Sequence, residues 1–191
     1  MLNKLSKPAL KTLIGLGVVF FLVLWFMGNF NSLVTSQNQV EKSWASVEVQ
    51  YQRRFDLIDN LVETVKAGQK QELEVFTAIA NARKQYHSAT SINAKTEATS
   101  SIETNLALIP RLQEAYPELK SNQLVQSLMS DLKGTENVIA TARDTFNTTA
   151  ANYNQNIRRF PKNIFAKVFG FEKTTLFAGV KGSQDAVKVK F

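Results

Sequence analysis

The only histidine in the chain, His87, is the first side chain to consider for acid–base or metal chemistry. The chain has no cysteine, which excludes a thiolate zinc site, a cysteine nucleophile and a disulfide framework. One histidine without a nearby array of carboxylates gives no usual zinc site. A Ser-His-acid triad would have to use His87, and nothing in the spacing of the serines and acids supports one.

Other signatures of catalysis are also missing from the sequence. Glu72 and Glu74 stand two residues apart, so on a helix they face different sides and do not form a catalytic carboxylate pair. No glycine-rich loop that could cradle a phosphate is present. We therefore predict a non-enzymatic protein with no catalytic residues, no metal-binding residues, no cofactor and no small-molecule substrate.

A cluster of charged and amide side chains is the most unusual polar feature. Its members lie in two separate stretches of the chain: Arg53, Arg54, Asp56, Asn60, Glu63, Glu136, Asn137 and Arg143. We favour the interpretation that they form salt bridges within a helical bundle and fix its register. The alternative is a docking surface for another membrane protein or another copy of the chain, because mixed charges of this kind set specificity more than affinity.

Residues 12–28, TLIGLGVVFFLVLWFMG, are uncharged and apolar on all sides. This length is just sufficient to cross the hydrocarbon core of a bilayer, and Trp25 near one end suits an interfacial anchor. Lys4, Lys7 and Lys11 precede the segment without any acid. The positive-inside rule therefore predicts a cytoplasmic N-terminus, with the rest of the chain outside.

Two other interpretations of this segment remain. It resembles a signal peptide in its basic start, but Phe26 fits poorly in the third position before a cut after Gly28. A buried helix of a soluble protein is the other alternative, and the all-round hydrophobicity argues against it.

Helical spacing dominates the residues beyond the span. No Gly or Pro occurs from residue 30 to residue 66, so the membrane helix is expected to continue into the first bundle helix. Its apolar residues keep a four-three spacing: Val40, Trp44, Val47, Tyr51, Ile58, Leu61 and Val65. Arg54 falls on this seam where an apolar residue is expected, and Gly68 is the first stop signal.

Three further helices are expected, over residues 71–88, 94–116 and 125–160. Pro110 should kink or split the third. The fourth is the clearest, with apolar residues at intervals of seven and small residues such as Thr135 at the other seam position. Short connections favour antiparallel neighbours. The predicted fold is therefore all-α, with an N-terminal transmembrane helix that runs into a long antiparallel up-down-up-down four-helix bundle.

Residues 160–171, FPKNIFAKVFGF, follow the fourth helix at the level of the bilayer in this topology. A short segment with basic, aromatic and amphipathic character is a candidate interfacial helix. The membrane-interface residues are expected to be Trp25, Phe160, Lys162, Phe165, Lys167, Phe169 and Phe171. Alternatively, the phenylalanines cap the core of the bundle.

The formal net charge of +7 is concentrated at the two ends of the chain. Residues 158–191 carry eight basic and two acidic residues, whereas the middle of the chain is nearly neutral. A nucleic-acid-binding protein would usually concentrate its basic residues on one folded face, so we expect no nucleic acid. Ends that lie near a bilayer would suit anionic headgroups.

The last residues, AVKVKF, alternate apolar residues with Lys188 and Lys190, as a strand does. Val187, Val189 and Phe191 are therefore candidate contacts, either to the sheet edge of a partner such as a PDZ-type domain or to tails of other copies. A disordered tail is the alternative. The expected organisation is a basic N-terminus (1–11), a transmembrane helix (12–28), a bundle (29–160), an amphipathic membrane-proximal segment (161–171) and a flexible basic tail (172–191).

Four stretches resemble the LemA family of bacterial membrane proteins: VQYQRRFDLIDNLVETVK (49–66), EAYPELKSN (114–122), LKGTENVIATARDTFN (132–147) and NYNQNIRRFPKNIFAKVFGF (152–171). The resemblance covers nearly the whole chain after the span and depends on several motifs in a fixed order. It implies a four-helix bundle on one N-terminal anchor and supplies no defined activity. Pro110 and Asp59 depart from the family pattern, which puts the local helix geometry in doubt there.

Together these features favour a non-enzymatic, membrane-anchored scaffold or self-assembling structural protein of the cell envelope. The alternative is an adaptor or regulator of a membrane-bound protease or signalling protein. The expected partners are the lipid bilayer and either further copies of the chain or another membrane protein. The expected location is the bacterial plasma (inner) membrane, as a single-pass protein with the bundle on the extracytoplasmic side.

The orientation is testable because the chain lacks cysteine. A single cysteine placed between Ser88 and Asn93 is expected to react with a membrane-impermeant thiol reagent in cells whose outer barrier alone is permeabilised. Labelling that requires lysis of the inner membrane would reverse the predicted topology.

Overall fold

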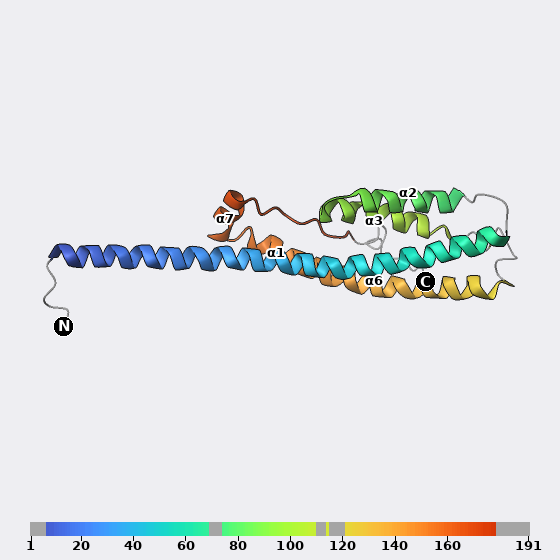
Figure 1. The fold of residues 1–191 in the computed structure, drawn as a ribbon, viewed down its shortest axis with the longest axis horizontal. Coiled ribbons are helices and arrows are strands. Elements are labelled where there is room, and N and C mark those ends of the chain that lie inside the picture. Colours follow the sequence, from blue (N-terminus) through green and yellow to red (C-terminus); the bar gives the residue numbers. More distant parts are fainter. Residues whose placement is uncertain (1–6, 69–73, 110–113, 115–120, 179–191) are drawn as a thin grey trace, which may run out of the picture. The chain divides into compact units, whose positions relative to one another are not determined.

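A computed structural model describes residues 7–68, 74–109, 114 and 121–178. Five helices occur in this part of the chain: α1 (Lys7–Gly68), α2 (Glu74–Ser88), α3 (Ile92–Leu106), α6 (Gln123–Asn156) and α7 (Lys162–Phe169). No strand occurs among these residues. The prediction of an all-α protein is confirmed (Figure 1).

The chain divides into two compact units, and α1 and α6 each contribute to both. The N-terminal unit comprises Met1–Gln39 and Asn152–Lys173, and the bundle unit comprises Val40–Ala151 and Thr174–Phe191. We describe each unit by itself.

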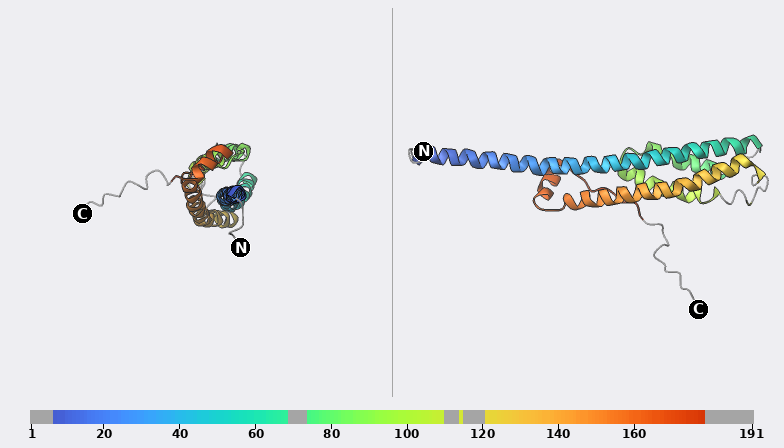
Figure 2. Two further views of the ribbon diagram at one scale, coloured as in Figure 1. Left: turned by 90° about the vertical axis from the view of Figure 1, so that its left-hand side faces the viewer. Right: turned by 90° about the horizontal axis from the view of Figure 1, so that it is seen from below.

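In the bundle unit, α1 and α6 lie side by side and antiparallel (Figures 1 and 2). Near the start of this part of α1, Trp44 packs edge-on against Phe146 with ring centroids 5.2 Å apart. Further along α1, Arg54 donates a hydrogen bond to Thr135, which precedes Phe146 on α6. The residue numbers of these contacts rise along α1 and fall along α6, so the two helices are antiparallel.

The two shorter helices complete the alternation. Phe55 packs against Tyr86 of α2 with centroids 5.6 Å apart, and Asp59 further along α1 pairs with Arg83, which precedes Tyr86. α2 is therefore antiparallel to α1. On α3, Lys95 pairs with Glu48 and the later Glu103 pairs with Arg54, so α3 runs parallel to α1. The order up, down, up, down matches the predicted bundle.

The predicted seam of α1 forms the core of the bundle unit. Every apolar residue of the predicted seam is buried: Val40, Trp44, Val47, Tyr51, Ile58, Leu61 and Val65. From α6, the residues at intervals of seven are buried as well: Val125, Leu132, Ile139 and Phe146. α1 is described as far as Gly68, and the residues that follow this predicted stop signal lie outside the described part of the chain.

α6 ends earlier than the sequence pattern indicates, and a proline explains the difference. α6 ends at Asn156, although the pattern reaches Phe160. The ring of Pro161 would clash with the carbonyl of residue 157 in a continued helix, and proline disfavours helical backbone at the residue before it. α3 ends at Leu106, four residues before Pro110, where the sequence predicted a kink or a split of the third helix.

α3 also starts two residues before the expected Ala94. The hydroxyl of Ser91 accepts a hydrogen bond from the backbone N–H of Ala94 at 3.2 Å. This is an N-cap, which satisfies one of the amides that a helix start leaves without a partner. Ser91 therefore sets the first turn of α3.

In the N-terminal unit, α7 packs against α1. Phe165 and Ala166 are buried in one cluster with Leu33 of α1, and Phe171 packs against the same cluster. Gly170 ends α7 with a positive φ of 73°, and the N–H of Phe171 donates to the carbonyl of Ala166 at 2.9 Å. This left-handed cap turns the chain so that Phe171 returns to α1.

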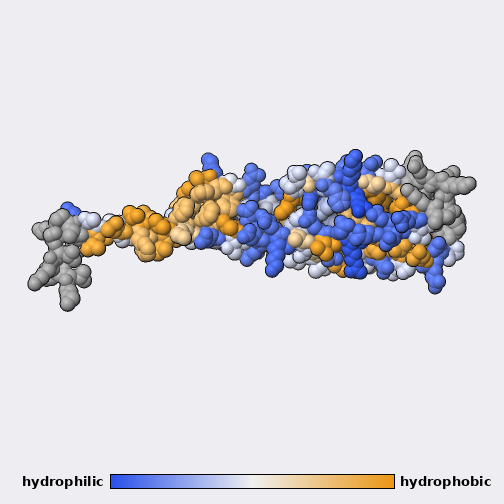
Figure 3. Space-filling view, in the orientation of Figure 1, coloured by the Kyte–Doolittle hydropathy of each residue, from blue (hydrophilic) through white to orange (hydrophobic). Residues whose placement is uncertain are grey.

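The N-terminal part of α1 exposes its apolar side chains on all faces. Leu13 through Met27 include no buried large residue, and Figure 3 shows this stretch as apolar surface. Within the part of the chain that the structure describes, α1 is the one helix long and apolar enough to cross a membrane. A helix that exposes apolar residues all round is suited to lipid.

Candidate functional site

The polar centre of the bundle unit is the guanidinium of Arg54. Arg54 stands on the apolar seam of α1, and its side chain is 3% exposed. Its Nε donates to Oγ1 of Thr135 on α6 at 2.9 Å, and its Nη1 donates to both carboxylate oxygens of Glu103 on α3 at 3.1 Å. A buried charge needs such partners, because an unpaired one strongly disfavours folding.

Glu103 serves a second arginine as well as the buried one. Nη2 of Arg143 on α6 donates to Oε1 of Glu103 at 2.8 Å, and the hydroxyl of Tyr51 donates to the same oxygen at 3.0 Å. Arg143 also donates to the Tyr51 oxygen. One acid from α3 therefore joins groups from α1 and α6, and we call Arg54, Glu103, Arg143, Tyr51 and Thr135 the buried polar cluster.

The cluster shifts the ionisation of its phenol. Burial raises the pKa of Tyr51 well above its usual value near 10, the charge of Glu103 raises it further, and Arg143 opposes the shift. Burial likewise raises the pKa of Tyr86, with smaller contributions from Glu48 and Tyr51. Both phenols therefore stay protonated at neutral pH, and Tyr51 acts as a hydrogen-bond donor.

A segment beyond α7 covers Arg143. The guanidinium lies 5.4 Å from the centroid of the Tyr51 ring and 4.9 Å from that of Phe177, which makes two cation–π contacts. The side chain of Asn147 accepts from the backbone N–H of Phe177 at 2.9 Å and donates to its carbonyl at 3.1 Å. Phe177 also stacks on Trp44 with centroids 5.9 Å apart.

Part of the predicted tail is thus held on the bundle unit. The backbone N–H of Thr175 donates to Oδ1 of Asn93 at 2.7 Å, in addition to the contacts of Phe177. Residues 172–178 belong to the segment that the composition alone predicted as a flexible tail. Val187, Val189 and Phe191 lie outside the described residues.

The structure divides the polar residues predicted from the sequence into two groups. Arg54 and Arg143 meet at Glu103, within the bundle unit. The other six are exposed on α1 and α6: Arg53, Asp56, Asn60, Glu63, Glu136 and Asn137. Arg53 lines a shallow hollow of about 180 Å³ with Asp131 and Gly134 of α6, and Asp56 accepts from Gln52 on its own helix at 2.8 Å.

Glu103 and the role of Tyr51 were not predicted from the sequence. The signal was an arginine on an apolar seam, which requires an acid from another helix. Several acids could meet that need, and α3 has a weak apolar pattern, so the sequence did not identify which. Thr135 was expected only as a small seam residue, yet its hydroxyl oxygen accepts a hydrogen bond from Nε of Arg54.

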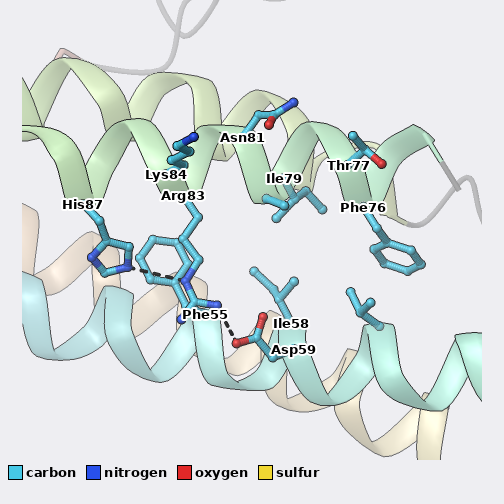
Figure 4. A pocket seen from close by; sticks show the side chains of 12 residues that line it. Phe55, Ile58, Asp59, Phe76, Thr77, Ile79, Asn81, Arg83, Lys84 and His87 are labelled. Atoms are coloured by element: carbon cyan, nitrogen blue, oxygen red, sulfur yellow. Dashed lines mark hydrogen bonds and ion pairs between the residues drawn. The ribbon is translucent and has the colours of Figure 1, made fainter. Parts of the chain in front are cut away.

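A cleft of about 530 Å³ lies between α1 and α2 in the bundle unit (Figure 4). Phe55 and Ile58 of α1 face Phe76 and Ile79 of α2 across it, so its walls are apolar. Its volume lies in the range of small-molecule sites, about 300–1,000 Å³.

Polar side chains at one end of this cleft contact other residues of the bundle unit. Arg83 pairs with Asp59, lies 5.3 Å from the centroid of the Phe55 ring, and contacts Nε2 of His87 at 3.4 Å (Figure 4). His87 has no serine or acid in a triad arrangement among these lining residues. Over the described part of the chain, no group of three or more His, Asp and Glu side chains could hold a metal ion. The geometry thus gives the cleft apolar binding capacity and no evident chemistry.

The predicted membrane-interface residues gather in the N-terminal unit, with different exposures. Phe165 is buried and contacts Trp25 and Phe26 with centroids 5.7 and 5.2 Å apart. Phe169 packs on Phe30 at 5.0 Å, and Phe171 packs on Phe30 at 6.0 Å. Nζ of Lys162 donates to Oγ of Ser32 at 2.7 Å, whereas Phe160 and Lys167 are exposed.

Comparisons with known proteins identify relatives of this chain. A model of the LemA family matches residues 43–191. Magnetosome protein MamQ of Magnetospirillum gryphiswaldense is 25% identical over 188 residues, which cover 85% of this chain and 69% of that protein. Magnetosome proteins MamQ 1 and MamQ 2 of Paramagnetospirillum magneticum are each 26% identical over 195 residues, which cover 88% of this chain and 71% of the relatives.

Glu103→Gln is expected to lower the free energy of unfolding by about 3 kcal/mol. Removing one partner of a buried ion pair costs about 3–5 kcal/mol, and the lower end applies because the Glu103 side chain is 35% exposed. Thermal melts followed by circular dichroism in mild detergent would measure the change. Glu97→Gln, an exposed position on the same helix, is the control, and equal effects of the two substitutions would contradict the role of Glu103.

Two tyrosines whose rings lie 5.7 Å apart provide a matched pair. The buried Tyr86 hydroxyl has no hydrogen-bond partner among the described residues, so Tyr86→Phe is expected to raise the free energy of unfolding by about 1 kcal/mol at pH 7. Tyr51→Phe removes a bonded hydroxyl and is expected to lower it by about 1 kcal/mol. The same melts test both, and an unchanged or lower stability of Tyr86→Phe would refute the assignment.

These phenols also predict an effect of high pH. Their pKa values in the fold lie above that of an unfolded phenol. The part of the free energy of unfolding that depends on their protonation is therefore fully present below about pH 10 and is lost as pH rises further. Either Phe variant should lose less stability than the parent between pH 9 and about pH 11.

Proposed function

The chain belongs to the LemA family, and on this premise we propose that it is a non-enzymatic scaffold or self-assembling structural protein of the bacterial cell envelope. It is membrane-associated, like the family, through the apolar part of α1. We place it in the plasma membrane with its N-terminus in the cytoplasm and the bundle outside. The short-range excess of lysine before the span supports this orientation.

The division of the polar residues is the observation that carries the proposal. The charged groups of the buried polar cluster pair with one another: Arg54 and Arg143 share one carboxylate, and Tyr51 bonds to both Glu103 and Arg143. Such a cluster fixes how helices fit together and offers no free acid or base to a substrate. The six exposed residues of the motif stretches remain for contacts with other molecules.

The names of the relatives state no catalytic activity. The three MamQ proteins are named as magnetosome proteins. For this chain we propose a membrane-held helical bundle that takes part in an assembly.

The cleft between α1 and α2 favours a second candidate function. Its apolar walls and its volume of about 530 Å³ suit an apolar segment of a different protein. In this alternative the chain is an adaptor or regulator of a membrane-bound protease or signalling protein.

Size analysis of the full chain after mild-detergent extraction and cross-linking separates the candidates. The scaffold proposal predicts a uniform homo-oligomer. Asp56→Lys should weaken it, because the reversed charge lies on the exposed face of α1 that carries the motif residues. Asp144→Lys is the matched control, since it makes the same charge change at an exposed position of α6 outside this group.

The remaining outcomes have definite meanings. A complex of one copy with a different protein would favour the adaptor and overturn self-assembly. A lone monomer with an unchanged melting temperature would overturn both proposals.

A further inference from the structure

The faces of α7 are divided between a protein contact and an exposed surface. Successive residues of a helix are separated by about 100°, so positions four apart share a face. Lys162, Phe165, Ala166 and Phe169 lie on the side that contacts α1. Ile164 and Val168 share a second face, and Asn163 and Lys167 share a third.

The second face is apolar and faces away from the packed cluster. Ile164 is 54% exposed and Val168 is 71% exposed, whereas Phe165 on the neighbouring face is only 8% exposed. Phe160, just before α7, is 80% exposed. Three large apolar side chains within nine residues are thus left without protein contacts that would bury them, beside a polar third face.

The position of α7 along α1 indicates that lipid covers this apolar face. Phe165 and Phe169 contact Trp25, Phe26 and Phe30. These residues lie at the end of the apolar span and in the next helical turn of α1. If residues 12–28 cross the bilayer, these contacts place α7 at the bilayer surface. The helix lies against α1 within one compact unit, so this placement follows from packing inside that unit.

Charge indicates which lipids suit this position. Residues 158–173 contain five basic residues and one acid, and Arg158, Arg159 and Lys167 are exposed. Basic residues near a membrane surface attract anionic lipids. Apolar side chains beside basic ones are the composition of a helix that lies in the interface.

We propose that α7 is an interfacial lipid-binding helix with divided faces. Phe165 and Phe169 lock it to the end of the span, Phe160, Ile164 and Val168 enter the acyl boundary, and Lys167 with Arg158 and Arg159 contacts anionic headgroups. The inference rests on the membrane span and not on the scaffold role. It separates the phenylalanines that the sequence pattern grouped together, because Phe165 serves the protein interior and Phe160 serves the lipid.

The absence of native cysteine allows a direct test on the full chain. Single-cysteine variants Ile164→Cys, Val168→Cys, Asn163→Cys and Lys167→Cys would each carry a nitroxide label in vesicles of phosphatidylethanolamine and phosphatidylglycerol. Collisions with oxygen report lipid, and collisions with a water-soluble nickel chelate report water. We expect oxygen to dominate at 164 and 168 and nickel to dominate at 163 and 167.

Two outcomes would overturn the lipid assignment. Nickel access at all four positions would mean that the apolar face is solvent-exposed. Low access of both reagents at 164 and 168 would mean that a protein, either another copy or a partner, covers it. Failure of self-assembly in the size analysis would leave this result unaffected.

A second measurement tests the charge. Energy transfer from a dye on Asn163→Cys to acceptor-labelled phosphatidylglycerol should exceed transfer to acceptor-labelled phosphatidylcholine at the same acceptor density. Replacing Arg158 and Arg159 by Gln should reduce the difference. Equal transfer to both lipids in the parent would overturn the anionic preference.

Discussion

A guanidinium buried among helices needs a carboxylate, and this need constrains the bundle unit. Arg54 takes the place of an apolar residue on the seam of α1 and can be accommodated only if α3 brings Glu103 and α6 brings Thr135 to the same level. A slip of either helix by one turn, about 5.4 Å, would leave the charge without a partner. Because replacing a buried ion pair by apolar residues is often neutral or stabilising, we propose that the cluster determines register more than it adds stability.

The N-terminal unit obeys a different constraint. Its packing combines a cluster of aromatic rings with the buried Leu33 and Ala166, and Lys162 donates a hydrogen bond to Ser32. Edge-to-face rings contribute about 0.5–1.5 kcal/mol each beyond their buried area, and they tolerate an apolar environment. Such packing does not depend on the exclusion of water from charged groups. It is therefore suited to a position where one side of the structure meets hydrocarbon and the other meets headgroups.

Much of the fold could be predicted because periodic patterns determine which helix faces are buried. The four-three spacing of α1 and the seven-residue spacing of α6 identified their core faces. The end of α6 before Pro161 was placed too late, since apolar spacing continues past the point where a proline ring excludes the preceding turn. The apolar run also predicted a membrane helix, which the exposed side chains of α1 support.

The centre of the polar cluster could be predicted only in part. Arg54 and Arg143 stood out in the sequence. Glu103 lies on a helix rich in Ala, Ser and Thr, whose weak apolar pattern does not indicate which of its acids faces the core. The contact of Phe177 was hidden for a related reason. A short segment without regular structure is bound by one phenyl ring and one amide side chain, and no periodicity reports such contacts.

The two hydrogen bonds between Asn147 and Phe177 have a mechanical consequence. They fix the backbone of Phe177 to α6, and its ring stacks on Trp44 of α1. A force applied to the chain beyond Ala178 therefore reaches α6 and α1 through Phe177.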